Sequence, residues 1–195
     1  MFLETICILN GKIQNIVSHK KRMQETASYF NFTAPELPDI EALLTDGMHE
    51  SKVKCRVCYH NEITSIEFER YVPNNLKSLK LINMFPDYSF KFSNRKAIDD
   101  LLKFRNGCDD ILIVRNGLIT DTSYTNVVFR KDNMYFTPNF PLLNGTKRQK
   151  LLENKIIEEA VINVETIKQY DRVWLINALL DIEDDVSLSV EQIFE

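Results

Sequence analysis

The chain has 195 residues, a length that suits one large domain or two small lobes with a shared interface. Hydrophobic residues make up 44% of it, and it has only 5 Gly and 6 Pro, so we expect a folded globular protein. The formal net charge of -4 excludes the basic surface that nucleic-acid binding requires, and no apolar run has the length of a membrane span. A small anionic ligand would therefore need a local group of hydrogen-bond donors.

The N-terminal residues lack the basic start and long apolar core of a signal peptide, so we expect a cytoplasmic protein. The four cysteines, Cys7, Cys55, Cys58 and Cys108, are scattered along the chain. No second Cys or His pair accompanies the spacing of Cys55 and Cys58, so we expect reduced thiols and no metal site.

The first part of the chain predicts an α+β lobe. Its elements are predicted as strands over 2–9, 13–17, 52–59 and 63–71, a helix capped by Ser18, a short helix over 39–48, and a connection over 73–80. The helix after Ser18 begins with the basic residues His19, Lys20, Lys21 and Arg22, with His19 and Arg22 on one side. This basic cluster is either a solvated helix face or part of an anion site.

Residues 87–93 alternate cleanly, which predicts a strand with Tyr88, Phe90 and Phe92 on one face. Lys91 would then project from the opposite face. A lysine in this position is either an exposed edge charge or the rigidly mounted amine that imine chemistry requires.

Residues 117–129 place one acid, Asp121, and one amide, Asn126, between two apolar strands. A buried acid needs a cationic or protonated partner, or it stays neutral, so this run is a candidate site. The alternative is a polar hairpin connection, in which such residues are common. The other predicted elements are strands over 110–114, 134–137 and 173–176 and helices from Asn94, from Asn144 to Thr146, and over 189–194.

The helix that begins at Asn144-Gly145-Thr146 has a predicted apolar stripe of Leu152, Ile156 and Ala160. The backbone N-H groups of its first turn and the Thr146 hydroxyl could bind a phosphate. The alternative is an ordinary capped helix.

Six motifs occur in a fixed order along nearly the whole chain. They are LET at residues 3–5, His19-x-x-Arg22, Tyr88-x-x-Lys91-x-x-Asn94-Arg95, Asp121-TSYT-Asn126, Leu143-NGTK-Arg148 and Asn177-Ala-Leu. This set resembles the class IV aminotransferase family of pyridoxal 5'-phosphate enzymes, also called fold type IV.

The resemblance implies a two-lobe α+β fold of the D-amino acid aminotransferase type. Residues 1–80 would form a shortened N-terminal α/β sandwich lobe, because the chain starts at a strand that the family reaches after a leading segment. Residues 81–195 would form a mixed, β-barrel-like C-terminal lobe that binds the cofactor. Pyridoxal phosphate would lie between the lobes, and the protein would be a homodimer.

The resemblance also implies roles for individual residues. Lys91 would carry the cofactor covalently and act as the catalytic base, and Asp121, where the family usually has Glu, would pair with the pyridine nitrogen. The phosphate would be held by Arg22, Gly145, Thr146, Lys147 and Asn177. Ala178 would lie near the substrate carboxylate, and Thr5 is a candidate hydroxyl on the substrate side.

Within the family, the chain is most similar to 4-amino-4-deoxychorismate lyases, which supply 4-aminobenzoate for folate biosynthesis. This similarity implies lysis of a small amino substrate to 4-aminobenzoate and pyruvate. Two alternatives stay open: a transaminase of the branched-chain or D-amino acid type, and a shortened relative that binds the cofactor without catalysis.

Overall fold

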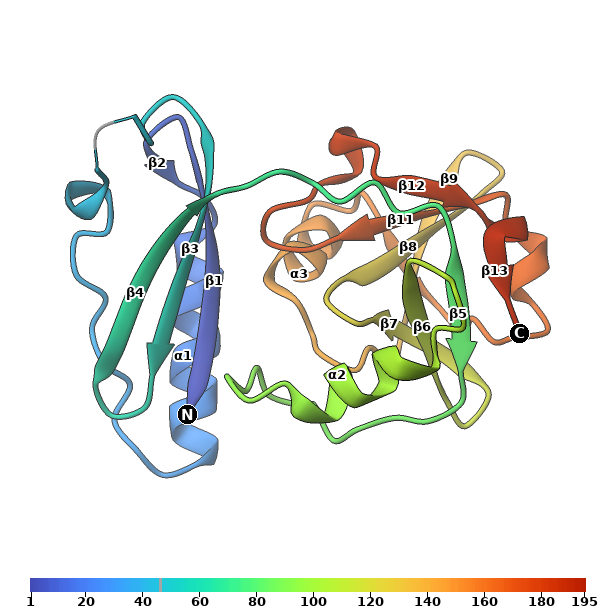
Figure 1. Cartoon of the computed structure of the whole chain (residues 1–195), viewed down its shortest axis with the longest axis horizontal. Helices are drawn as coiled ribbons and strands as arrows, with labels where there is room; N and C mark the ends of the chain where they lie inside the picture. The colour runs from blue at the N-terminus through green and yellow to red at the C-terminus, as the bar shows by residue number, and fades with distance from the viewer. Residues whose placement is uncertain (46) are drawn as a thin grey trace. The chain divides into compact units, whose positions relative to one another are not determined.

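A computed structural model describes residues 1–45 and 47–195, which form two compact units (Figure 1). The first unit consists of residues 1–72 and 90–94, and the second consists of residues 73–89 and 95–195. Each unit combines helix with sheet, which confirms the predicted α+β class. The boundary expected after residue 80 falls within a strand of the second unit, Leu79–Ile82.

The first unit is a four-stranded antiparallel sheet with a helix, α1, packed against its strand β1 (Figure 1). The strand order is β2-β1-β3-β4, and the elements are β1 (Phe2–Leu9), β2 (Lys12–Ile13), α1 (Ile16–Tyr29), β3 (Lys52–Tyr59) and β4 (Ile63–Arg70). Buried and half-buried residues alternate along β3, so Val53, Cys55 and Val57 face the core with Ile6 and Ile8 of β1.

Helix α1 begins earlier than the sequence predicts. Asn15, with a left-handed φ of 53°, is the residue before the first turn, and the Ser18 hydroxyl donates to the Asn15 side chain at 2.8 Å. The predicted cap at Ser18 is therefore wrong, and the return strand ends at Ile13 because the helix starts at Ile16. The helix expected over 39–48 includes residue 46, which lies outside the described residues; the described part of it contains a 3-10 turn, Glu41–Leu43.

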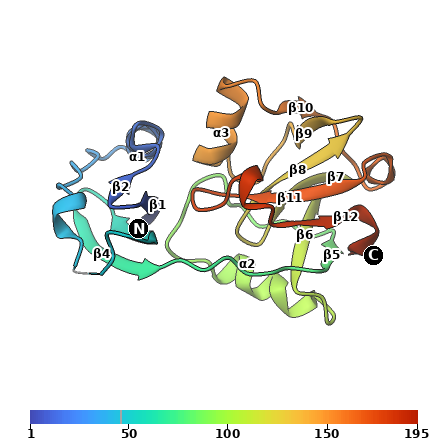
Figure 2. The same cartoon turned by 90° about the horizontal axis from the view of Figure 1, so that it is seen from above.

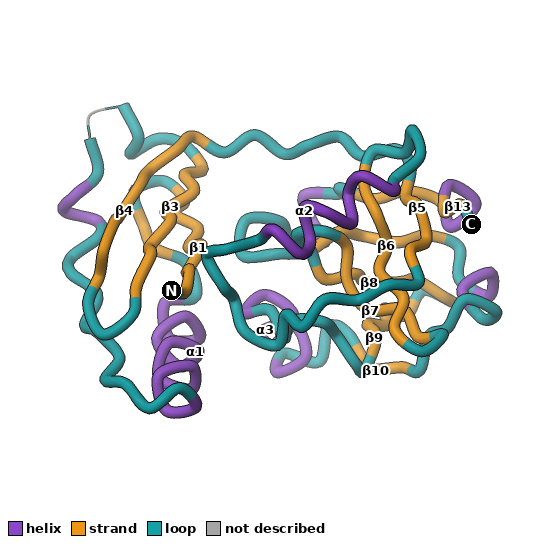
Figure 3. Tube along the Cα trace, turned by 60° about the horizontal axis from the view of Figure 1, so that its bottom comes forward, coloured by secondary structure: helices purple, strands orange, loops and turns teal. Residues whose placement is uncertain are grey.

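The second unit is built on a curved, mixed nine-stranded sheet (Figures 2 and 3). Its main path runs β10-β9-β8-β7-β6-β5-β13, and β11 pairs with both β8 and β12. The strands are β5 (Leu79–Ile82), β6 (Asp110–Arg115), β7 (Leu118–Thr122), β8 (Asn126–Lys131), β9 (Met134–Pro138), β10 (Glu158–Ala160), β11 (Arg172–Ile176), β12 (Ser187–Ser189) and β13 (Ile193–Phe194). Its helices are α2 (Lys96–Leu101) and α3 (Thr146–Glu153), and its 3-10 turns are Leu102–Phe104, Ile167–Gln169, Ile182–Asp184 and Val190–Gln192.

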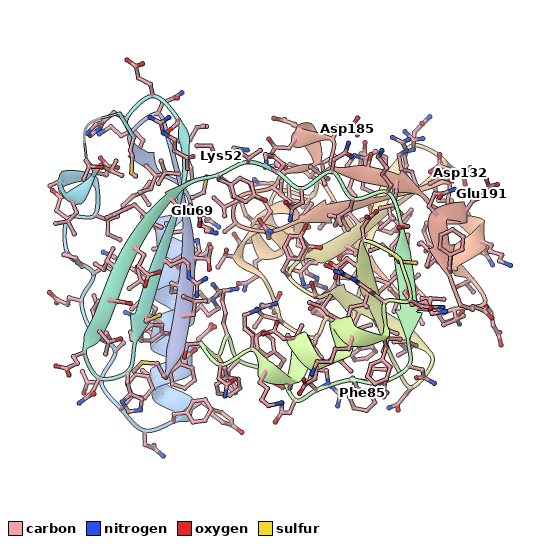
Figure 4. The ribbon with its side chains drawn as sticks, viewed as in Figure 1. Lys52, Glu69, Phe85, Asp132, Asp185 and Glu191 are labelled. Carbon is pink, nitrogen blue, oxygen red and sulfur yellow. The ribbon has the colours of Figure 1, made fainter. Side chains whose placement is uncertain are left out.

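Apolar residues of these strands form a continuous core, in which Leu112, Val127, Phe129, Val173 and Leu175 have no exposed surface. Outside the core, Phe85 lies in the segment before α2 (Figure 4). The Arg115 guanidinium carbon lies 4.9 Å from the centre of its ring. No helix in the described ranges has the length and apolar character needed to cross a membrane.

Two predictions for the second unit are wrong. The stripe expected to continue from Leu152 to Ala160 is interrupted because α3 ends at Glu153, where Lys155 adopts a left-handed φ of 55°. The N-H groups of Ile156 and Lys155 bond back to the carbonyls of Leu151 and Leu152, a helix-ending pattern usually signalled by glycine.

The helix expected over 189–194 is instead a 3-10 turn followed by β13, which pairs in parallel with β5. The connection predicted over 73–80 overlaps the first two residues of β5, because a four-residue strand shows too short a pattern to be distinguished from a loop.

Candidate functional site

The first unit contains a buried cluster of charged and polar side chains at Glu4. This residue has no exposed surface, and α1 presents His19 and Arg22 to it from positions one turn apart. The His19 Nδ1 atom lies 2.6 Å from one Glu4 oxygen, and the Arg22 Nε donates to the other at 2.9 Å, while Nη2 also donates to Glu4. The solvated-face interpretation is therefore wrong for His19 and Arg22, although Lys20 and Lys21 are exposed.

The pairing determines the charge of this cluster. Burial by itself raises the pKa of Glu4, but the Arg22 charge and the hydrogen bonds from His19 and Arg22 outweigh it and lower the pKa to about 2. Burial lowers the pKa of His19, although its bond to Glu4 opposes the change. We therefore treat Glu4 as ionised and His19 as neutral near pH 7, with its Nδ1-H donating to Glu4.

Lys91 lies in the segment of the first unit that consists of residues 90–94 and runs beside the start of β1. Its carbonyl oxygen accepts a hydrogen bond from Leu3 N at 2.9 Å, and its positive charge contributes to the lowered pKa of His19. The Phe92 N-H donates to the Phe90 carbonyl at 2.9 Å, which makes a three-residue turn centred on Lys91.

The strand predicted over 87–93 is therefore wrong, since only Phe92 forms a single bridge, to Phe2. The predicted anchoring by aromatic residues is present for Phe90 and Phe92, which pack with Phe2, Met23 and Tyr59. The bond from Leu3 and the turn between Phe90 and Phe92 thus both hold the backbone at Lys91.

Thr5 is half-buried on β1, next to Glu4 and opposite Arg56 of β3 in the register. Because successive strand residues face opposite sides, Thr5 points away from the sheet face that carries Glu4. It is thus separate from the buried cluster, and its role toward a substrate stays a prediction.

The second unit contains the acid Asp121, which is buried on β7 and pairs in register with Asn126 of β8. One Asp121 oxygen accepts from Asn126 Nδ2 and the other accepts from Leu143 N, both at 2.8 Å. Burial raises the pKa of Asp121 to about 7, although these hydrogen bonds and the charge of Arg148 act in the opposite direction. No cationic side chain hydrogen-bonds Asp121 in the part of the chain that the structure describes.

This raised pKa predicts a pH dependence of stability for the cofactor-free protein. The folded state holds the Asp121 proton more tightly than the unfolded state, so its contribution is fully present below about pH 4 and is lost as pH rises through about 7. Between pH 5 and 8 we expect the wild type to lose about 2–3 kcal/mol more of its free energy of unfolding than Asp121→Asn loses, measured by urea unfolding. The difference between the two curves isolates Asp121, because His19 titrates in both proteins; parallel curves would contradict the assignment.

Helix α3 begins at Thr146, directly after Gly145, and no side chain caps its N-terminus. Thr146 is buried, whereas the Lys147 ammonium lies 2.5 Å from an Asp181 oxygen. The structure therefore places Gly145, Thr146 and Lys147 at a helix start that suits an anion, with the charge of Lys147 already shared with Asp181.

Gly145 is needed for its small size, since its φ of -67° is open to any residue. A Cβ atom there would lie 2.1 Å from Asn126 Oδ1. We expect Gly145→Ala to lower the free energy of unfolding by about 1–3 kcal/mol in urea titrations, because the Asn126 side chain must move. The double variant with Asn126→Ala should cost less than the sum of the single changes. Additive costs would show that this contact is not the cause.

Asn177 follows the last strand residue of β11 and closes a turn. Its Oδ1 accepts from Leu179 N at 2.8 Å and from Leu180 N at 3.1 Å. Ala178 is half-buried within this turn. The side-chain oxygen of Asn177 thus accepts hydrogen bonds within its own turn, and the phosphate role of Asn177 stays a prediction.

Sequence reasoning gave no role to three residues of these clusters, Glu4, Asn126 and Arg148. Glu4 stands out as a charge in an apolar strand, and the LET motif contains it. Arg148 is buried on α3 and donates to Pro138 O at 2.9 Å, Asn144 Oδ1 at 3.0 Å and Glu159 Oε1 at 2.6 Å. No sequence signal showed that an arginine in this helix would be buried.

Comparisons with known proteins identify the class of protein. Residues 100–183 match the profile of the family described as amino-transferase class IV. A crystal structure of a provisionally named 4-amino-4-deoxychorismate lyase from Haemophilus somnus is 33% identical, with a TM-score of 0.81 over 91% of this chain and 95% of that one. The chain therefore belongs to the class IV aminotransferase family, whose enzymes use pyridoxal phosphate.

Two further relatives are similar over most of their lengths. A Haemophilus influenzae protein without an assigned function is 36% identical over 180 residues, which cover 90% of this chain and 96% of that protein. A provisionally named aminodeoxychorismate lyase of Schizosaccharomyces pombe is 23% identical over 191 residues, which cover 88% of this chain and 83% of the relative. The Haemophilus somnus and Schizosaccharomyces pombe proteins are both provisionally named as lyases of the same substrate, whereas other similar structures are named as aminotransferases.

Proposed function

We propose that this protein is a pyridoxal phosphate enzyme that cleaves 4-amino-4-deoxychorismate to 4-aminobenzoate, a folate precursor, and pyruvate. The observation that carries the cofactor assignment is Asp121, a buried acid with a pKa raised to about 7 and no hydrogen-bonded cation among the described residues. A protonated pyridine nitrogen would supply the cationic partner that keeps such an acid ionised. The names of the relatives support the choice of lyase.

We propose that further residues bind the phosphate of the same cofactor. The uncapped start of α3 at Gly145 suits its phosphate, and Arg22 brings a guanidinium whose orientation is fixed by Glu4. Asn177 and Lys147 are the further phosphate contacts in this proposal. We also propose that the active protein is a homodimer, which light scattering after gel filtration would test.

Lys91 has the central chemical role in this proposal. Bound pyridoxal phosphate supplies an electron sink conjugated with the substrate amino group. Lys91 Nζ would hold the cofactor, and the same amine would act as the base that takes the proton from the substrate carbon bearing the amino group. The enolpyruvyl group would then leave from the adjacent ring carbon, which makes the ring aromatic. Protonation of the departing enolpyruvate gives pyruvate. Thr5 is the proposed hydroxyl on the substrate side, and Ala178 lies near the substrate carboxylate.

A transaminase is the second candidate, because the matched family is named for amino transfer and would use the same Lys91. The experiment that separates the two measures pyruvate released from 4-amino-4-deoxychorismate with pyridoxal phosphate and no oxo acid. Continuous release with equal 4-aminobenzoate supports the lyase. A single turnover of bound cofactor by amino acids, without release, supports the transaminase, and no reaction in either assay supports a non-catalytic relative.

A further inference from the structure

Asn126 connects two features of the second unit that are far apart in sequence. Its Nδ2 atom donates to Asp121 Oδ1 on β7 and to the Leu143 carbonyl, both at 2.8 Å. The Leu143 N-H in turn donates to the second Asp121 oxygen at 2.8 Å. Asp121, Asn126 and Leu143 thus form a closed ring of hydrogen bonds in which both carboxylate oxygens are used.

The same side chain also contacts the start of α3. Asn126 Oδ1 lies so near Gly145 that a Cβ atom there would approach to 2.1 Å. Gly145 immediately precedes the first helical residue, Thr146. The loop that leads into α3 is therefore joined to Asp121 both by the Leu143 N-H and by one buried amide, Asn126.

Arg148 fixes the other side of this loop. It donates to Pro138 O at 2.9 Å and to Asn144 Oδ1 at 3.0 Å, so the segment from Pro138 to Gly145 is held at both ends. Arg148 is the charged residue whose positive charge lowers the pKa of Asp121, against the effect of burial, and its hydrogen bonds go to Asn144, Pro138 and Glu159 and not to Asn126. The effect of replacing Asn126 on the pKa of Asp121 can therefore be measured separately from the effect of the Arg148 charge.

We propose that Asn126 is a positioning residue that couples the acid at 121 to the anion site at the start of α3. This inference rests on the proposed function: the partner of the ring nitrogen and the backbone that binds the phosphate would be held at one fixed separation by this amide. Asn126 itself touches neither end of the cofactor in this proposal, and it acts through Asp121, Leu143 and Gly145.

The test uses Asn126→Ala, with Thr137→Val as a matched control. Thr137 is equally buried on the neighbouring strand, and its hydroxyl donates to Val127 O at 2.9 Å without touching Asp121 or the loop. Carbon NMR of the cofactor-free protein follows the titration of Asp121, assigned with Asp121→Asn. Affinities for pyridoxal phosphate and for pyridoxal, which lacks the phosphate, are measured on the same proteins.

In Asn126→Ala we expect the titration midpoint of Asp121 to rise, because a donor that favours the carboxylate is lost. We also expect the ratio of pyridoxal phosphate to pyridoxal affinity to fall by about fivefold to tenfold, which corresponds to one displaced hydrogen-bonding group. Thr137→Val should change neither. Gly145→Ala, which displaces the amide from the other side, should shift both in the same direction and provides a second test if Asn126→Ala does not fold.

An unchanged midpoint and an unchanged ratio in both variants would overturn the inference while leaving the proposed function intact. A wild-type protein that binds no pyridoxal phosphate would overturn the proposed function and the cofactor part of the inference together. Even then, a raised titration midpoint of Asp121 in Asn126→Ala would still establish Asn126 as the residue that positions Asp121.

Discussion

Replacing Lys91 with alanine is expected to reduce turnover of 4-amino-4-deoxychorismate by at least about a thousandfold, within the range for loss of an acid-base group. The reason is that Lys91 both carries the cofactor and moves the substrate proton in the proposed reaction. Initial rates of pyruvate release at saturating pyridoxal phosphate measure the effect. Cofactor absorbance of the same sample shows whether covalent attachment is lost as well.

The matched control is Lys103→Ala. Lys103 is exposed in the second unit and pairs with Asp100 at 2.5 Å, so its loss should leave the rate within about twofold and cost less than about 1 kcal/mol of stability. Adding ethylamine should restore part of the rate of Lys91→Ala, because a free amine can replace the missing base. A Lys91→Ala protein with normal rate and covalently bound cofactor would contradict the assignment.

Replacing Glu4 with alanine should lower the free energy of unfolding by about 3–5 kcal/mol, the range for breaking a buried charge pair. The change leaves Arg22 and His19 buried without the carboxylate that both contact. Urea unfolding at pH 7 measures the loss. Glu69→Ala is the control, because Glu69 on β4 (Figure 4) pairs with Lys54 at 2.6 Å but its side chain is 67% exposed, so we expect little change in the free energy of unfolding.

Acid titration provides a second test of Glu4. Since the folded-state pKa is lowered to about 2, the contribution of Glu4 is present above about pH 4.5 and is lost as pH falls toward 2. The wild type should therefore lose more stability than Glu4→Ala over this interval. Equal losses in the two proteins would show that the carboxylate is not stabilised by its partners.

The long strands and the site motifs were predictable because their patterns are local. Alternation along residues 52–59 gave the bounds of β3, and one acid within an apolar run marked Asp121. The burial of that acid followed from its position between two strands. The pattern also showed where Lys91 would be anchored, since Phe90 and Phe92 both pack into the aromatic cluster with Phe2.

The predictions that failed depend on contacts between distant residues. The sequence left the choice between a solvated face and an anion site open for the basic residues at the start of α1, because nothing in the helix itself shows that Glu4 contacts His19 and Arg22. Alternation over 87–93 could not reveal the three-residue turn at Lys91, which is fixed by the bond from Leu3. The early end of α3 was missed because Lys155, not glycine, adopts the left-handed conformation there.

The roles of the polar partners could not be predicted for the same reason. Asn126 is five residues from Asp121, so their pairing across the hairpin was accessible from sequence, but its contacts with Leu143 and Gly145 were not. Those contacts depend on how the loop before α3 returns to the β7–β8 hairpin.

The most direct test of the account is to identify the residue that carries the cofactor. The purified protein is incubated with pyridoxal phosphate, reduced with borohydride, digested, and analysed by mass spectrometry for the phosphopyridoxyl group. We predict a single stoichiometric label on Lys91, which is absent from Lys91→Ala and retained in Lys103→Ala. A label on another lysine, or no label while Lys91 is intact, would contradict the central claim.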